Sequence, residues 1–236
     1  MSRLLVAGCS FTSYFWPTWA DYIAPNFDSY TNLAIPGSDN ATIARNVTAM
    51  AEPGDTVVIM WSSYARHSYE ITTWNDSVNQ FGGTNISDQY YFTNIFNQFE
   101  RFLTSLDYLQ WVATDSIVRG YKTIHLSAFP YLLGEMCSPI ADNMLPLIKE
   151  KQFYIDLINK NDLLTFSSNY KKLDIQWVRN NQVFDDNHPT PIAHYDYADQ
   201  IVKPLLGIDK LKISRAQAQL DDDNAHRETP TGRYYV

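Results

Sequence analysis

Two kinds of hydrophobic pattern alternate along the chain. Short apolar runs rich in β-branched residues occupy Arg3–Ala7, a stretch ending near Ala34, Thr56–Trp61, Lys122–Ser127 and 173–178. The segments 16–24 and 40–51 separate the first three of these runs, and in them apolar residues recur every three or four positions. This alternation of strand and helix patterns predicts a parallel sheet of five strands with helices on both faces, an α/β fold.

The second half of the chain contains longer elements. Apolar residues at helical spacing over 92–112 predict one long amphipathic helix. A last helix is expected to start at Thr190 and Pro191, which suit an N-cap and a first helical position, and to end at Pro204 and Gly207. We therefore expect one domain over 1–208.

Two segments fall outside this regular pattern. Residues 64–88 are polar and aromatic, and we interpret them as a loop or lid inserted between a strand and the long helix. Residues 209–236 change in character, with basic residues followed by an acidic run. We expect them to form an extension outside the core that is either flexible or docked on a partner.

Composition narrows the functional classes. Of 236 residues, 45% are hydrophobic and 14% aromatic, which fits a globular domain with a sizeable core and excludes a disordered chain. A formal net charge of −8 argues against nucleic acid as the main partner, because phosphate binding needs a basic surface. The two cysteines, Cys9 and Cys137, form neither a disulfide framework nor a zinc motif.

The lengths of the apolar runs also indicate where in the cell the protein is located. The apolar start of the chain is shorter than the core of a signal peptide, and no run reaches the roughly 20 residues that cross a bilayer. We expect no signal peptide, no membrane partner and a cytoplasmic location.

The residues that follow the strands carry the candidate chemistry. In an open α/β sheet, ligands bind at the carboxyl ends of the strands. There the chain places Ser10 after the first strand, Gly37 after the second, Ser63 after the third, and Asp185 and His188 just before the last helix. These residues are expected to face one crevice.

Their types fit nucleophilic catalysis. A serine needs a histidine that takes its proton, and that histidine needs an acceptor on its other nitrogen. Asp185 and His188, three residues apart in a turn, can supply both, and the adjacent Asp186 is interpreted as a solvated carboxylate, with an exchange of roles left open. The backbone N–H groups of Ser10 and Gly37 are natural donors to an oxyanion.

Four short segments, three that follow the first three strands and one that precedes the last helix, contain these residues. In this order the four segments resemble the SGNH (GDSL-type) hydrolase superfamily, and the first of them, Gly8-Cys9-Ser10-Phe11-Thr12, is similar to members found in tailed phages. The resemblance implies a flavodoxin-like three-layer sandwich and ester or acetyl-ester hydrolysis without metal or other cofactor. It makes Ser10 the nucleophile, His188 the base, Asp185 its partner and Gly37 an oxyanion donor.

The third of these segments, which follows the third strand, departs from the family pattern. The family commonly has Gly-x-Asn-Asp, in which the asparagine side chain donates to the oxyanion, whereas this chain has Trp-Ser-Ser-Tyr at 61–64. Ser63 takes the asparagine position with a shorter donor, and Asn40 is the alternative donor. The change predicts a slow enzyme or a restricted substrate.

Three residues are weaker candidates for substrate binding. Tyr64 and Trp74 are expected to stack on sugar rings, with core packing as the alternative. Arg66 is expected to bind a carboxylate or sulfate, with an ion pair to Glu70 or Asp39 as the structural alternative.

The sequence thus predicts a serine esterase that hydrolyses acetyl or other small acyl esters, with an acetylated glycan as one substrate class. The alternative is a catalytically weak binding or structural module, for example a phage particle component. Expected partners are the ester substrate and, beyond it, a second copy of the chain or phage structural proteins. A phage protein would be located in the host cytoplasm or the virion.

Overall fold

The centre of the molecule is a parallel sheet of four strands. The computed structural model describes residues 3–66, 68–69, 82–83, 98–130, 150–158, 161–173, 175–179, 182–228 and 232–235. The strands are β1 (Arg3–Ala7), β2 (Ser29–Asn32), β3 (Thr56–Trp61) and β6 (Lys122–Ser127), in the order β2-β1-β3-β6. All three pairings are parallel, as the strand and helix alternation predicted.

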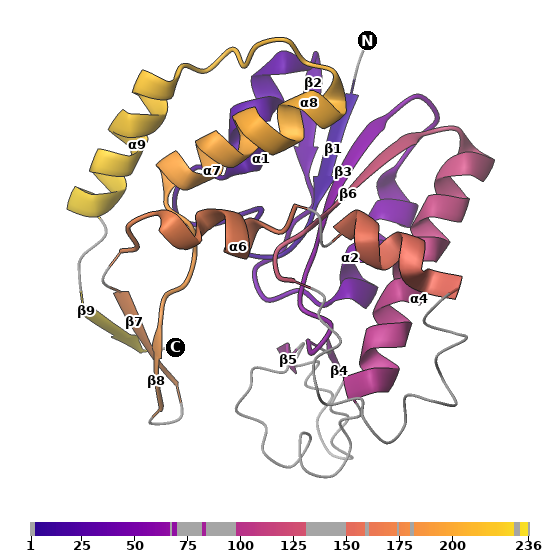
Figure 1. Cartoon of the computed structure of the whole chain (residues 1–236), viewed down its shortest axis with the longest axis horizontal. Coiled ribbons are helices and arrows are strands. Elements are labelled where there is room, and N and C mark those ends of the chain that lie inside the picture. The colour runs from indigo at the N-terminus through magenta and orange to yellow at the C-terminus, as the bar shows by residue number, and fades with distance from the viewer. Residues whose placement is uncertain are drawn as a thin grey trace, which may run out of the picture.

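Helices cover both faces of this sheet (Figure 1). One face carries α2 (Asn40–Met50) and α4 (Gln98–Arg119). The other carries α1 (Trp19–Ile23) and α7 (Pro191–Tyr197), which continues through a π-helical turn, Ala198–Val202, into α8 (Lys203–Leu206). Within the described ranges, no helix is both long enough and apolar enough to cross a bilayer.

The two faces of the sheet bury alternate residues of each strand. Leu4, Val6 and Met60 pack with α1 and α7 in one cluster. Leu5 and Ile59 pack with α2 and α4 in the other. Because successive side chains of a strand point to opposite faces, a continuous apolar run such as that of β3 is what a sheet buried on both sides requires.

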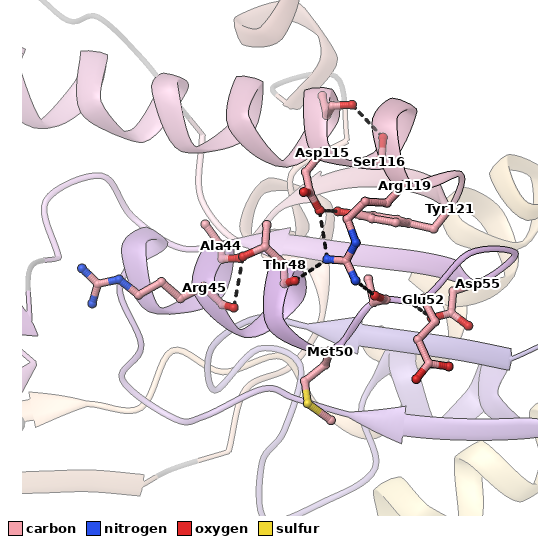
Figure 2. Close-up of polar contacts among 12 residues, drawn as sticks. Ala44, Arg45, Thr48, Met50, Glu52, Asp55, Asp115, Ser116, Arg119 and Tyr121 are labelled. Carbon is pink, nitrogen blue, oxygen red and sulfur yellow. Dashed lines mark hydrogen bonds and ion pairs between the residues drawn. The ribbon is translucent and has the colours of Figure 1, made fainter.

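Two arginines hold the amino-terminal edge of the sheet, and Figure 2 shows the contacts of one of them, Arg119. The guanidinium of Arg119, in the last turn of α4, donates to the carbonyl oxygens of Thr48 and Ala51 at the end of α2 and pairs with Asp115. Arg3 binds Asp55 through two of its nitrogens. These contacts lie at the opposite end of the strands from the residues with candidate chemistry, so their role is structural.

The predicted fifth strand belongs to a different sheet, so the central sheet has four strands and not five. β7 (Ile175–Arg179) pairs antiparallel with β8 (Gln182–Asp185) and parallel with β9 (Gly232–Tyr235). Beside β6, where a fifth strand would lie, there is only the isolated parallel bridge between Ser127 and Asp162 in the described part of the chain. The apolar pattern identifies a strand but does not specify its partner.

Shorter elements complete the described chain. They are the 3₁₀ turns Ala24–Asn26 and Ser167–Asn169, α6 (Leu163–Phe166), a helical stretch over 150–158, and the paired two-residue strands β4 (Ser68–Tyr69) and β5 (Gly82–Gly83). The last two lie in the segment 64–88, most of which is outside the described residues.

The C-terminal extension is folded onto the domain over much of its length, which corrects the expectation that it lies outside the core. Leu211 and Ala218 are buried in the cluster that contains α1 and α7. Helix α9 (Arg215–Glu228) packs against α7 (Figure 1). Asp222, in the acidic run of this extension, is buried and accepts a hydrogen bond from the N–H of Ile192 in the first turn of α7.

Candidate active site

Ser10 lies in a tight turn directly after β1. The turn is closed by a hydrogen bond from the N–H of Thr12 to the carbonyl of Cys9, and Ser10 is buried. A Cβ on Gly8 would lie 2.3 Å from Oγ1 of Thr12 and 3.1 Å from the carbonyl oxygen of Met60. Glycine is therefore needed for the chain to turn so close to β3 and bring Ser10 to the carboxyl edge of the sheet.

The helix that follows does not use Ser10 as a cap. Helix α1 begins at Trp19, and its N-cap is Thr18. The carboxylate of Asp21 accepts from the N–H of Thr18 at 2.8 Å. Capping thus gives no account of Ser10, whose hydroxyl is directed elsewhere.

His188 meets this hydroxyl from the other end of the chain. It lies in the loop between β8 and α7, and its Nε2 is 2.7 Å from Oγ of Ser10. On the other side of the ring, Nδ1 is 2.6 Å from Oδ1 of Asp186. The structure therefore brings Ser10, His188 and a carboxylate into one hydrogen-bonded line, which is the arrangement that activates a serine.

A local turn holds Asp186 under the histidine. Oδ1 of Asp186 also accepts from the backbone N–H of His188 at 2.8 Å, which closes a side-chain turn two residues long. Oδ2 accepts from the hydroxyl of Tyr14 at 2.5 Å. Burial acts to raise the pKa of Asp186, but the hydrogen bonds and charge of His188 and the hydrogen bond of Tyr14 together hold this pKa below its ordinary value. The carboxylate is thus kept ionised beside the imidazole.

The expectation that Asp185 orients His188 is wrong in this geometry. Asp185 is exposed and accepts from Nε2 of Gln176 on the neighbouring strand at 2.9 Å. Asp185 ends β8, so its side chain and that of Asp186 point in different directions, and only Asp186 turns inward. The carboxylate in contact with His188 is therefore that of Asp186.

Aromatic residues near Ser10 enclose the imidazole, and they are not among the site residues predicted from the sequence. The ring of Tyr14 stacks on that of His188, with centroids 3.8 Å apart and planes 15° apart. The ring of Phe11 lies 4.9 Å from it. Trp16 packs edge-on against Tyr14 and donates from Nε1 to the carbonyl of Pro189. The available signal was the aromatic run 14–16, only a few residues beyond the predicted nucleophile.

The backbone amides of Ser10 and Gly37 remain available to an oxyanion. The N–H groups of Ser10 and Gly37 donate no hydrogen bond within the described ranges. Gly37 is exposed, has a φ of 85°, and lies in the loop that the N–H of Ile35 ties to the carbonyl of Gly8. Both predicted donors can thus bind a ligand: the N–H of Ser10 lies in the turn after β1, and the N–H of Gly37 lies in the loop that is hydrogen-bonded to Gly8.

The side chains proposed for the third donor differ in availability. Both hydrogens of the Asn40 amide are used, since Nδ2 donates to the carbonyl of Ser62 and to the hydroxyl of Ser105. Asn40 therefore braces the loop after β3 and is not the alternative oxyanion donor. The hydroxyl of Ser63 accepts from the N–H of Ala65 at 3.2 Å, which leaves its own proton for donation.

The structure also shows what the weaker candidates for substrate binding contact. Tyr64 packs edge-on against Phe102 of α4, with centroids 5.5 Å apart, which fits the core-packing alternative. Arg66 lies with its guanidinium over the ring of Phe129, 5.8 Å from the centroid. Trp74 lies outside the described residues.

Two other histidines, both buried, do not compete with His188 as a base. His125 accepts from the indole N–H of Trp61 through Nδ1, and burial lowers its pKa to about 4. His194 on α7 is completely buried, and burial, followed by the nearby His188, lowers its pKa to about 3. Among the described residues, no three His, Cys, Asp or Glu side chains gather in a way that could hold a metal ion.

Of three comparisons with known proteins, only the comparison with solved structures finds similar chains. No family model and no curated protein sequence matches the chain. Similar solved structures include the protein YXIM of Bacillus subtilis (11% identity, TM-score 0.43), a GDSL-like lipase from Bacteroides thetaiotaomicron (17%, 0.43) and phospholipase A1 from Streptomyces albidoflavus (11%, 0.45).

These similarities extend over most of this chain. The matched parts are 88% of this chain and 57% of the first structure, 87% and 87% for the second, and 84% and 98% for the third. The chain thus spans a little over half the length of the Bacillus protein. With TM-scores below 0.5 these similarities carry no argument about this chain, and the function proposed below rests on the contacts of Ser10, Asp186 and His188.

Proposed function

We propose that the chain is a serine hydrolase of carboxylic esters, with acetyl or another small acyl group as the transferred acid. The observation that carries the proposal is the continuous line from Ser10 through His188 to Asp186, with contacts of 2.7 Å and 2.6 Å. A binding or structural module has no need to keep Ser10 in hydrogen-bond reach of His188, 178 residues later in the chain, with Asp186 held behind it. The geometry therefore favours the hydrolase over the module.

Acylation uses each member of this line. Oγ of Ser10 attacks the ester carbonyl carbon while Nε2 of His188 takes the hydroxyl proton. The imidazolium that forms donates through Nδ1 to the ionised carboxylate of Asp186. The tetrahedral oxyanion accepts from the N–H groups of Ser10 and Gly37. Collapse expels the alcohol, which takes the proton from Nε2, and leaves the acyl group on Ser10.

Deacylation repeats these steps with water. His188 takes a proton from a water molecule that attacks the acyl carbonyl, and the second tetrahedral intermediate uses the same donors. Its collapse returns the proton to Oγ of Ser10 and releases the acid. With Asn40 engaged elsewhere, only the Ser63 hydroxyl among the two predicted side chains is left to add a third donor, so a modest rate is expected.

The first test is covalent labelling with a fluorophosphonate, read by intact mass and peptide mapping. We expect one label on Ser10 in the wild-type protein, none in Ser10→Ala, and strongly reduced labelling in His188→Ala. Ser13→Ala is the matched control, since Ser13 lies in the same segment but outside the hydrogen-bonded line, and it should be labelled as the wild type is.

Hydrolysis of p-nitrophenyl acetate by the same four proteins provides the companion measurement, with circular dichroism to show that each is folded. Turnover that survives in Ser10→Ala would contradict the assignment of the nucleophile. Absence of labelling in folded wild-type protein would contradict the hydrolase and favour the binding module. If Ser10 is labelled, acetate release from acetylated oligosaccharides tests the glycan substrate class.

A further inference from the structure

Arg66 lies on the same edge of the sheet as the hydrogen-bonded line. It is part of the loop that follows β3, and its guanidinium covers the ring of Phe129, which follows β6. The ring of Phe129 lies 5.0 Å from that of Phe11, and Phe11 lies 4.9 Å from the imidazole of His188. Two aromatic rings in contact therefore connect the guanidinium to the proposed catalytic base.

The guanidinium is not satisfied by the described protein. Nη1 of Arg66 is buried and has no hydrogen-bond partner among the described residues. Asp39, one of the two expected ion-pair partners, accepts from the N–H of Thr42 as the N-cap of α2, and Glu70, the other, lies outside the described residues. A sheltered cationic N–H without a partner is costly, which makes this nitrogen a place where a ligand anion gains free energy.

Three other arginines in the described ranges differ from Arg66 in this respect, because each is paired with a carboxylate. Arg3 binds Asp55, Arg119 pairs with Asp115, and Arg215 binds Asp196 through two nitrogens. The chain is acidic, so carboxylates are abundant, and yet none in the described part pairs with Arg66. A planar guanidinium with free N–H groups matches the paired oxygens of a carboxylate or sulfate.

We propose that Arg66 binds a negatively charged oxyanion of the substrate, so that the preferred esters carry a carboxylate or sulfate a few bonds from the scissile carbonyl. This inference rests on the proposed hydrolase function and narrows its substrate class. The ring of Phe129 packs under the guanidinium and limits its movement. The side chain of Arg66 therefore loses less conformational entropy when the anion binds.

The test compares two esters that differ in one charge. Monomethyl succinate and methyl butanoate have acyl chains of the same length, and acid release from each is followed in a pH-stat. The readout is the ratio of their kcat/KM values in the wild type, Arg66→Gln, Arg66→Lys and Arg45→Gln. Arg45 is an exposed arginine on α2, so its variant makes the same change in net charge away from the edge.

We expect the ratio to favour the anionic ester in the wild type and to fall by about 10- to 100-fold in Arg66→Gln, as loss of a charge-assisted hydrogen bond implies. Arg66→Lys should retain part of the preference, and Arg45→Gln all of it. A second pair, 4-acetoxybenzoate against 4-methylphenyl acetate, shows whether the charge is read on the alcohol side instead. A ratio that is the same in Arg66→Gln and in the wild type for both pairs would overturn the proposal.

Two further outcomes are informative. If Arg66→Gln lowers the melting temperature without changing either ratio, Arg66 holds its loop and does not bind substrate. If no ester is hydrolysed by folded wild-type protein, the hydrolase function fails, and ligand-observed NMR still decides on Arg66. Monomethyl succinate should then bind the wild type more tightly than methyl butanoate does and lose this advantage in Arg66→Gln, and equal binding would overturn the proposal.

Discussion

The two adjacent aspartates before His188 allow a direct test of the site, because the structure gives them opposite roles. Asp186→Asn removes the negative charge that faces Nδ1 of His188, while Asp185→Asn makes the same chemical change one residue earlier on the exposed side. Both variants keep the shape of the side chain. We expect Asp186→Asn to lose most of the ester hydrolysis and Asp185→Asn to keep activity within about twofold of the wild type.

The size of the loss follows from the contacts. During acylation the imidazolium of His188 faces the Asp186 carboxylate, whose side chain is only 2% exposed. Two unit charges about 4 Å apart at an effective dielectric constant of about 20 attract by about 4 kcal/mol, which corresponds to about 10³-fold in rate.

The orientation of the new amide determines whether the loss is larger. The backbone N–H of His188 donates to the same oxygen as Nδ1 does, which favours keeping the amide oxygen toward the histidine. Inversion of the amide would instead present N–H to Nδ1 and force the wrong tautomer, for which losses near about 10⁴-fold are expected.

The assay is kcat and KM for p-nitrophenyl acetate across pH, with thermal unfolding by circular dichroism for both variants. Because the change acts on a charge that forms in the transition state, kcat should fall and KM should change little. A larger loss in Asp185→Asn than in Asp186→Asn, with both proteins folded, would refute the assignment of Asp186 and restore the prediction made from the sequence.

Three further outcomes follow from the same contacts. The folded-state pKa of Asp186 is lowered, so its ionised form stabilises the protein above about pH 4, and this stabilisation is lost as the pH falls through the folded-state pKa. The unfolding free energy should therefore fall less steeply with decreasing pH in Asp186→Asn than in the wild type. Tyr14→Phe keeps the ring on His188 but removes a hydrogen bond to the buried carboxylate, so urea unfolding should show a loss of about 1–3 kcal/mol, and an unchanged midpoint would contradict that contact. Asp222→Ala removes the acceptor for the N–H of Ile192 and should destabilise the protein by about 0.5–2 kcal/mol in the same assay, whereas no effect would show that α9 does not cap α7.

Much of the layout could be predicted from the sequence. The bounds of β1, β3 and β6 agree with the apolar runs, since strands buried on both faces have a continuous hydrophobic pattern. The proximity of Ser10 and His188 was also expected, because both follow strands or precede helices at the carboxyl edge of the sheet.

The remaining differences have physical causes that one sequence does not reveal. Asp185 and Asp186 are chemically identical, and the backbone direction at the end of β8 decides which one faces the histidine. Tyr14 reaches Asp186 across 172 residues, a contact that no local pattern encodes. The strand at 175–179 has the apolar pattern expected of a central strand, but its hydrogen bonds go to β8 and β9.

Finally, the long separation between Ser10 and His188 has a consequence for how the protein is made. The two residues are 178 positions apart, so at about 5–20 residues per second the base leaves the ribosome roughly 10–35 s after the nucleophile. The first strands emerge with an unactivated serine, and the helix that caps α7 is translated later still. Ser10 of a nascent chain therefore stays unactivated until His188 has been synthesised and has docked against it, and the onset of fluorophosphonate reactivity would time that docking.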